Sequence, residues 1–260
     1  MRVLFVGDVT GKPGRRLLAA RLAALRRAHG LDAIIVNGEN AAGGMGLTAG
    51  VAEELFATGV DVITGGNHIW HNREAYELLD ADPRVLRPAN YPPGVPGRGA
   101  AVITTASGAR LAVLNLQGRV FMQELDDPFR VGREQAAMLR AEVPAVIVDF
   151  HAEATSEKVA MGWYLDGIVS AVIGTHTHVQ TADERVLPGG TAYITDVGMT
   201  GPRDGIIGMK REAILERFLT QLPVRFEVAS GPVQLNAVII GIVDDGRAES
   251  IERLQIVADG

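Results

Sequence analysis

Four histidines in this chain stand where imidazole could bind a metal ion, next to runs of apolar residues. His151 follows one apolar run directly, and a second run leads into a Thr-His-Thr-His sequence that contains His176 and His178. His68 comes after a third run, in a Gly-Gly-Asn-His sequence. Neutral imidazole is the commonest protein ligand of transition metals. These positions therefore predict metal chemistry.

Carboxylate and amide side chains occupy similar places in the chain. Asp8 and the Glu39–Asn40 pair each come shortly after an apolar run, and Asn67 directly precedes His68. Open α/β sheets place their sites at the carboxyl ends of strands. We therefore expect these side chains to meet at one edge of a sheet.

A mixture of carboxylate, amide and imidazole suits Mn, Fe, Zn or Co better than Ca or Mg, which favour shells of oxygen. Six protein ligands exceed the need of one catalytic metal, whereas two metals that share a carboxylate use them economically at about 3.5–4 Å separation. We expect two transition metals, Fe or Mn first and Zn or Co as alternatives. His176 and His178 would point the same way in a strand, but beyond a strand end they could diverge to two metals or bind one together.

Strands and helices alternate along most of the chain, which is typical of an α/β fold. Gly30 is expected to end the first helix, and Thr48 to cap the second. The predicted strands are Val3–Val6, Ala33–Val36, Val60–Thr64, Ala101–Thr105, Arg110–Leu116, Ala145–Phe150, Ile168–Ile173, Val233–Val243 and Glu249–Val257. The predicted helices fill residues 14–30, 48–58, 73–80, 131–141 and 155–165.

Turn signals at Ser107-Gly108 and Asp244-Asp245-Gly246 predict two antiparallel hairpins beside the parallel units. We therefore expect two packed mixed β-sheets flanked by helices. A length of 260 residues allows one large core, so residues 1–260 are predicted to form a single domain. The proline-rich segment Arg87–Gly99 is interpreted as an ordered loop within that domain.

Composition excludes several classes of function. The net charge of −6 argues against non-specific binding of long nucleic acid. The lack of cysteine excludes disulfides, thiolate zinc sites and iron–sulfur clusters. The sequence predicts neither a signal peptide nor a membrane span. We expect a cytoplasmic protein with no membrane partner. The charge does not exclude a small nucleotide as ligand, because bound metal cations would supply local positive charge. The sequence permits a homo-oligomer without indicating an interface.

The order of the polar motifs resembles the calcineurin-like metallophosphoesterases over the full length of the chain. The motifs are Gly7-Asp8, Gly38-Glu39-Asn40, Gly66-Asn67-His68, His151 and Gly174-Thr175-His176-Thr177-His178. Three positions depart from the usual pattern: Thr10 replaces a histidine, Glu39 an aspartate and Ile69 an acidic residue. These departures resemble the YmdB-like branch, as do the stretches Arg87–Pro92, Asp149–Lys158 and Thr195–Gly201.

The resemblance implies a four-layer αββα sandwich and a role for each residue. One metal would take Asp8 and His178, the other Asn67, His151 and His176, with Glu39 as the bridge. Asn40 would fill the place of the missing histidine as a further ligand. His68 would be the catalytic residue that protonates the leaving oxygen, after a hydroxide between the metals has attacked phosphorus.

That branch hydrolyses 2′,3′-cyclic nucleotides, so the resemblance implies the same phosphodiesterase activity here. Two other interpretations use the same metals. One is a phosphatase or phosphodiesterase of broad specificity, and the other is a nucleotide-responsive regulatory protein with slow turnover, which Thr10 and Ile69 leave open. Mixed carboxylate and imidazole ligands also permit a di-iron redox protein, but the order of the motifs argues against it.

Overall fold

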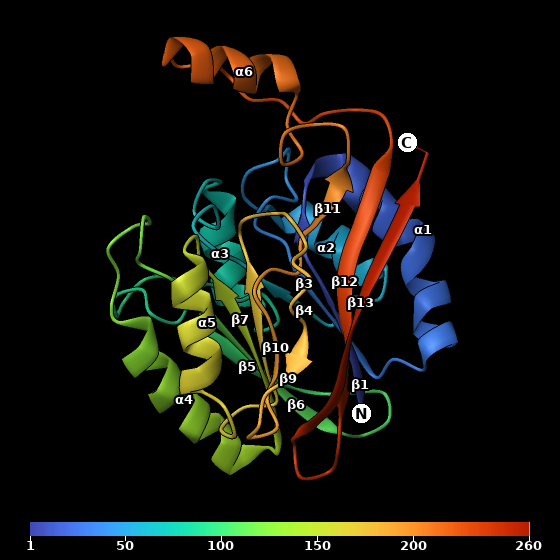
Figure 1. The fold of residues 1–260 in the computed structure, drawn as a ribbon, viewed down its shortest axis with the longest axis vertical. Helices are drawn as coiled ribbons and strands as arrows, with labels where there is room; N and C mark the ends of the chain where they lie inside the picture. The colour runs from blue at the N-terminus through green and yellow to red at the C-terminus, as the bar shows by residue number, and fades with distance from the viewer. Residues whose placement is uncertain (260) are drawn as a thin grey trace.

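The computed structural model describes residues 1–259 and forms two β-sheets that lie face to face (Figure 1). The helices are α1 (Gly11–His29), α2 (Ala49–Ala57), α3 (Glu74–Ala81), α4 (Pro128–Glu142), α5 (Thr155–Tyr164) and α6 (Arg211–Thr220). The strands of the first sheet are β1 (Arg2–Val6), β2 (Asp8–Val9), β3 (Ala33–Asn37), β4 (Val62–Thr64), β11 (Met199–Pro202), β12 (Val233–Ile242) and β13 (Ala248–Ala258). The strands of the second are β5 (Ala100–Thr104), β6 (Arg110–Gln117), β7 (Ala145–His151), β8 (Ala171–Thr175), β9 (Arg185–Val186) and β10 (Ala192–Ile194).

Both sheets mix parallel and antiparallel pairs, as the sequence predicts. The first sheet has the order β2-β11-β12-β1-β3-β4, with β13 paired to β12, and the second has the order β5-β6-β7-β8-β10-β9. Strands β1, β3 and β4 run parallel to one another, and so do β6, β7 and β8. The parallel groups bring the carboxyl ends of consecutive strands together, where sites form in such folds.

Alternating side chains of each strand divide the apolar core into three layers. Phe5 of β1 faces the second sheet and packs in one cluster with Val113 and Ile147. Its neighbour Leu4 faces the other way, toward Leu18 of α1. Helices α4 and α5 cover the outer face of the second sheet through a third cluster. The result is the predicted helix–sheet–sheet–helix sandwich.

Local signals in the sequence set several boundaries correctly. Gly30 ends α1 in a left-handed conformation with φ of 59°, and the Thr48 hydroxyl accepts a hydrogen bond from the Val51 amide at the start of α2. Both predicted hairpins form. The predicted strand 168–173 lies at 171–175, and β2, β9, β10, β11 and α6 are not predicted. Among residues 1–259 no helix is long and apolar enough to cross a membrane.

Candidate functional site

The predicted ligands gather where the parallel strands end. Asp8 begins β2 and is separated from the end of β1 by one residue, Gly7. His151 is the last residue of β7. Glu39 and Asn67 follow β3 and β4 within three residues, and His176 follows β8 directly. Strand geometry thus brings together groups that are far apart in the sequence.

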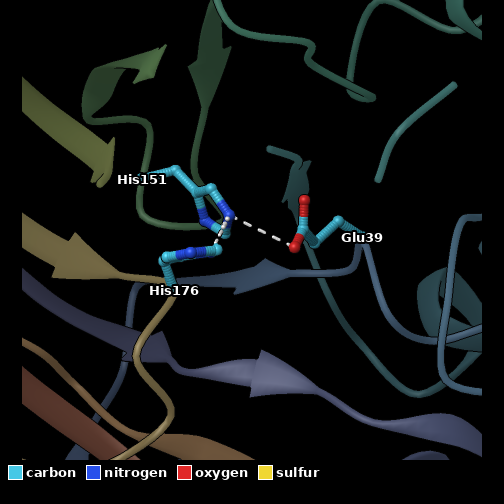
Figure 2. A group of neighbouring side chains, drawn as sticks. All are labelled: Glu39, His151 and His176. Atoms are coloured by element: carbon cyan, nitrogen blue, oxygen red, sulfur yellow. Dashed lines mark hydrogen bonds and ion pairs between the residues drawn. The ribbon is translucent and has the colours of Figure 1, made fainter. Parts of the chain in front are cut away.

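Three of these side chains converge on one point, as Figure 2 shows for Glu39, His151 and His176. The Nε2 atom of His151 lies 3.2 Å from Glu39 Oε1 and 3.0 Å from His176 Nδ1. The Asn67 side-chain oxygen lies 3.0 Å from the same Nε2 atom. Carboxylate, amide and imidazole atoms therefore surround a single position, which is the set predicted for one metal.

A second group also adjoins Glu39. The Nε2 atom of His178 is 3.7 Å from Asp8 Oδ1 and 3.3 Å from the Asn40 amide nitrogen, which is itself 3.3 Å from Glu39 Oε1. Glu39 Oε1 thus contacts a member of each group, as a bridging carboxylate would. The Asn40 carbonyl faces His68 instead, at 2.8 Å from its Nδ1.

Two observations indicate that these residues fit metal ions. Asp8 is fully buried, and its Oδ1 atom has no hydrogen-bond partner among the described residues. A buried carboxylate oxygen without a partner is costly unless a cation or proton compensates it. At Gly66, an added Cβ would collide with both Glu39 and His151, so this glycine keeps the space among the ligands open.

The loop that carries His176 and His178 has an unusual backbone. The two residues adopt positive φ angles of 100° and 68°, which non-glycine residues adopt only at an energetic cost that their surroundings must offset. His176 turns to His151, whereas His178 turns to Asp8. Of the arrangements open from sequence, the structure shows the divergent one.

A buried ion pair holds this loop in place. The Lys158 ammonium of α5 lies 2.7 Å from Asp196 Oδ2, and the same carboxylate oxygen accepts hydrogen bonds from the backbone amide and the hydroxyl of Thr177. Its other oxygen accepts from the Gly198 amide. Lys158 and Asp196 are both fully buried. The pair therefore fixes the residue between the two histidines.

Further polar groups orient His151 through its ring nitrogen Nδ1. The Thr175 hydroxyl lies 2.7 Å from Asp149 Oδ1, to which it donates, and 2.9 Å from His151 Nδ1. A hydroxyl that donates to a carboxylate accepts from the imidazole, so His151 carries a proton on Nδ1 and presents Nε2 to the site. Asn37 and Thr64 also donate to Asp149.

We expect Thr175→Val to weaken metal binding about 10–100-fold, because an outer group that orients a ligand contributes on that scale. The change keeps the side-chain shape and removes only the hydroxyl. Titration of the metal-free protein with Mn²⁺ measures the loss. Thr104→Val, at an exposed strand position, is the matched control. Equal Mn²⁺ affinity in the two variants would contradict the orienting role.

Charge among the buried groups shifts their protonation when metal is absent. Burial lowers the pKa of His151, but the negative charges of Glu39 and Asp8 outweigh it and raise the pKa to about 9. Burial and the charge of His151 lower the pKa of His176 to about 3, and burial raises the pKa of Asp149 to about 7. A proton on His151 thus occupies the position where a metal would bind.

Metal binding should therefore depend on pH. A metal ion must displace the proton of His151 below pH 9, so we expect Mn²⁺ affinity to rise about tenfold per pH unit between pH 6.5 and 8.5. The raised pKa stabilises the metal-free fold below pH 6.5, and this contribution is lost as pH rises through 9. Calorimetric titration at several pH values tests this; an affinity that does not change with pH would contradict it.

Sequence reasoning missed the residues that support the ligands. Asp149, Lys158 and Asp196 lie within the stretches that carry the resemblance, but their partners are distant in sequence. An acidic residue inside the apolar strand β7 was the one available signal for Asp149, since a buried carboxylate needs partners. The side chain of Arg119 is exposed and pairs with Asp127, and Arg119 does not line the cavity next to the ligands.

Comparisons with known proteins agree with the geometry. A family model described as YmdB-like protein matches residues 4–254. The chain is 53% identical over 260 residues to the 2′,3′-cyclic-nucleotide 2′-phosphodiesterase of Bacillus subtilis (strain 168), covering 100% of this chain and 98% of the relative.

Two solved structures show the same fold. One is described as a novel phosphatase from Mycoplasma pneumoniae, with a TM-score of 0.93, 36% identity, and coverage of 100% of this chain and 94% of that chain. The other is a 5′-nucleotidase precursor from Thermus thermophilus, with a TM-score of 0.62, 13% identity, and coverage of 100% and 54%; this likeness concerns the fold alone. The protein therefore belongs to the YmdB-like family of metallophosphoesterases.

Proposed function

We propose that this protein opens 2′,3′-cyclic nucleotides with the help of two transition metal ions held by the ligands described above. Phosphodiesterase activity itself follows from the family and from the 53% identity to a phosphodiesterase. The observation that supports the metal pair is the position of Glu39, whose Oε1 atom contacts both His151 and the Asn40 amide that neighbours His178.

The first metal would be held by Asp8 and His178, and the second by Asn67, His151 and His176. When bound, such ions lower the pKa of water and offset negative charge on phosphoryl oxygens. Fe or Mn fits the ligand set best, and Zn or Co fits as well. Asn40 is retained as a candidate ligand, although its carbonyl points to His68 in this structure.

His68 lines the cavity above the ligands and is one-third exposed. Its Nδ1–H donates to the Asn40 carbonyl at 2.8 Å, and Glu39 Oε1 lies 3.4 Å from the same nitrogen. These two groups replace the acidic partner that Ile69 removes. Among residues 1–259 no side chain hydrogen-bonds to Nε2 of His68, so a protonated His68 could donate from Nε2 to the departing ribose oxygen while water forms the new bond to phosphorus.

We expect His68→Gln to lower kcat for 2′,3′-cyclic AMP about 10²–10⁴-fold, the usual contribution of a general acid. A substrate with a p-nitrophenolate leaving group needs less protonation, so its hydrolysis should fall much less. Steady-state kinetics on both substrates, with metal content measured on each sample, tests this role. Equal losses on the two substrates would show that His68 acts in some other way.

The proposed activity is tested by turnover on one purified, metal-loaded sample. We expect about two metals per chain, fast hydrolysis of 2′,3′-cyclic AMP, and much slower hydrolysis of 3′,5′-cyclic AMP and a phosphomonoester. Equal rates on all three would indicate a broad phosphatase. Two metals with little turnover would indicate a nucleotide-responsive regulatory protein.

The partners follow from the same proposal. A small nucleotide is the expected substrate, and the net charge of −6 disfavours long nucleic acid. A cytoplasmic location and a homo-oligomer remain our proposals from the sequence.

A further inference from the structure

The cavity above the candidate metal site has two chemically different walls. Its volume is about 360 Å³, at the lower end of the range for small-molecule sites. One wall consists of polar groups that include Glu39, His68 and His178. Other lining residues are apolar: Met45, Ile207, Met209, Ile214 and Phe226. We call these residues the apolar wall.

The apolar wall is built from two segments that pack closely. Met45 belongs to the glycine-rich loop after β3, and the other four residues belong to the segment 205–228, which includes α6 at the top of the molecule (Figure 1). Gly44 has a φ of 98°, which favours glycine, and an added Cβ would come within 2.8 Å of the side chains of Met209 and Val228. Isolated bridges join Ile206 to Met209 and Met209 to Val228.

A hydrogen bond ties the apolar wall to the ligands. The Nδ1 atom of His178 lies 3.1 Å from the backbone carbonyl of Ile207, to which it donates. This bond directs His178 Nε2 toward Asp8 and fixes the position of Ile207 relative to it. Ile207 has a positive φ of 44° and its side chain is half exposed. The hydrogen bond thus holds Ile207, one residue of the apolar wall, next to the proposed metal ligand His178.

We propose that the apolar wall is the subsite for the nucleobase of the substrate. The proposal rests on the proposed function, in which the phosphate lies against the polar wall. The base of the nucleotide can then lie against the apolar lining, where Phe226 and the polarisable methionines offer contact to a flat ring. Among the described residues that line the cavity there is no lysine or arginine, so it suits one phosphate rather than a polyphosphate chain.

The test compares substrates that differ only in the base. The measured quantity is the ratio of kcat/KM for 2′,3′-cyclic AMP to that for methyl riboside 2′,3′-cyclic phosphate, which lacks the base. We expect Phe226→Ala and Met209→Ala each to lower this ratio, by roughly tenfold for Phe226→Ala. Phe218→Ala is the matched control, because Phe218 is exposed on α6 and outside the cavity; it should keep the wild-type ratio.

A binding measurement separates this proposal from the proposed function. Calorimetry with 3′-AMP and with inorganic phosphate needs no turnover. We expect Phe226→Ala to weaken the binding of 3′-AMP about tenfold relative to the binding of inorganic phosphate. If that loss occurs in a protein that does not hydrolyse cyclic nucleotides, the subsite stands and the proposed function fails. If Phe226→Ala matches Phe218→Ala in the kcat/KM ratio and in the affinity for 3′-AMP relative to phosphate, the subsite is overturned, whatever the protein hydrolyses.

Discussion

Glu39→Ala should abolish metal-dependent hydrolysis, with kcat/KM reduced more than about a hundredfold. Groups that only orient a ligand contribute about 10–100-fold, and Glu39 would contact both metals directly. The change also removes the partner of His151 and of the His68 amide. Hydrolysis of 2′,3′-cyclic AMP and elemental analysis of the same sample measure the two effects together.

Glu39→Gln is the more informative control, because it keeps the shape of the side chain and removes the charge. We expect it to retain the fold, as followed by thermal unfolding, and still to bind both metals more weakly than wild type. A variant with full metal content and normal turnover would refute the bridging assignment. A variant that loses one metal and keeps the other would indicate that Glu39 serves one position only.

The second large effect concerns the Lys158–Asp196 pair. Removing one partner of a buried ion pair costs about 3–5 kcal/mol, since it leaves the other charge buried and uncompensated. We therefore expect Lys158→Met to lower the Tm by about 10 °C. Metal affinity should fall as well, because Asp196 holds Thr177 between His176 and His178.

Two further variants define the cause of that loss. Lys210→Met breaks an exposed ion pair with Glu227 and should leave the Tm almost unchanged. The double variant Lys158→Met with Asp196→Asn removes both charges and should recover part of the lost stability. Unfolding curves of metal-free protein measure these changes. A Lys158→Met protein as stable as Lys210→Met would show that the buried pair contributes little.

The strand ends were predictable from sequence because each follows a simple physical pattern. A buried strand appears as an apolar run, and a polar residue directly after it lies at the edge of the sheet. This pattern identifies the surroundings of Asp8, Glu39, Asn67, His151 and His176 without knowledge of the strand order. The order itself, with β12 placed beside β1, is a long-range property that local patterns do not contain.

Other features were not predictable for related reasons. Lys158 lies in a helix, where lysine is usually exposed, and its burial depends on Asp196 in another part of the chain. The strands β9, β10 and β11 are too short to show periodicity. Helix α6 has exposed Phe218 and Leu219, so its pattern does not separate a buried face from a solvent face.

The position of β12 has a consequence for how the protein is made. Strand β1 lies between β3 and β12, and Arg2 pairs with Gly241. A nascent chain that ends just before β12, which spans residues 233–242, would contain every proposed ligand and still lack that strand. Pairings between such distant segments form slowly. Metal capture by the complete site should therefore be a late event, after β12 has left the ribosome.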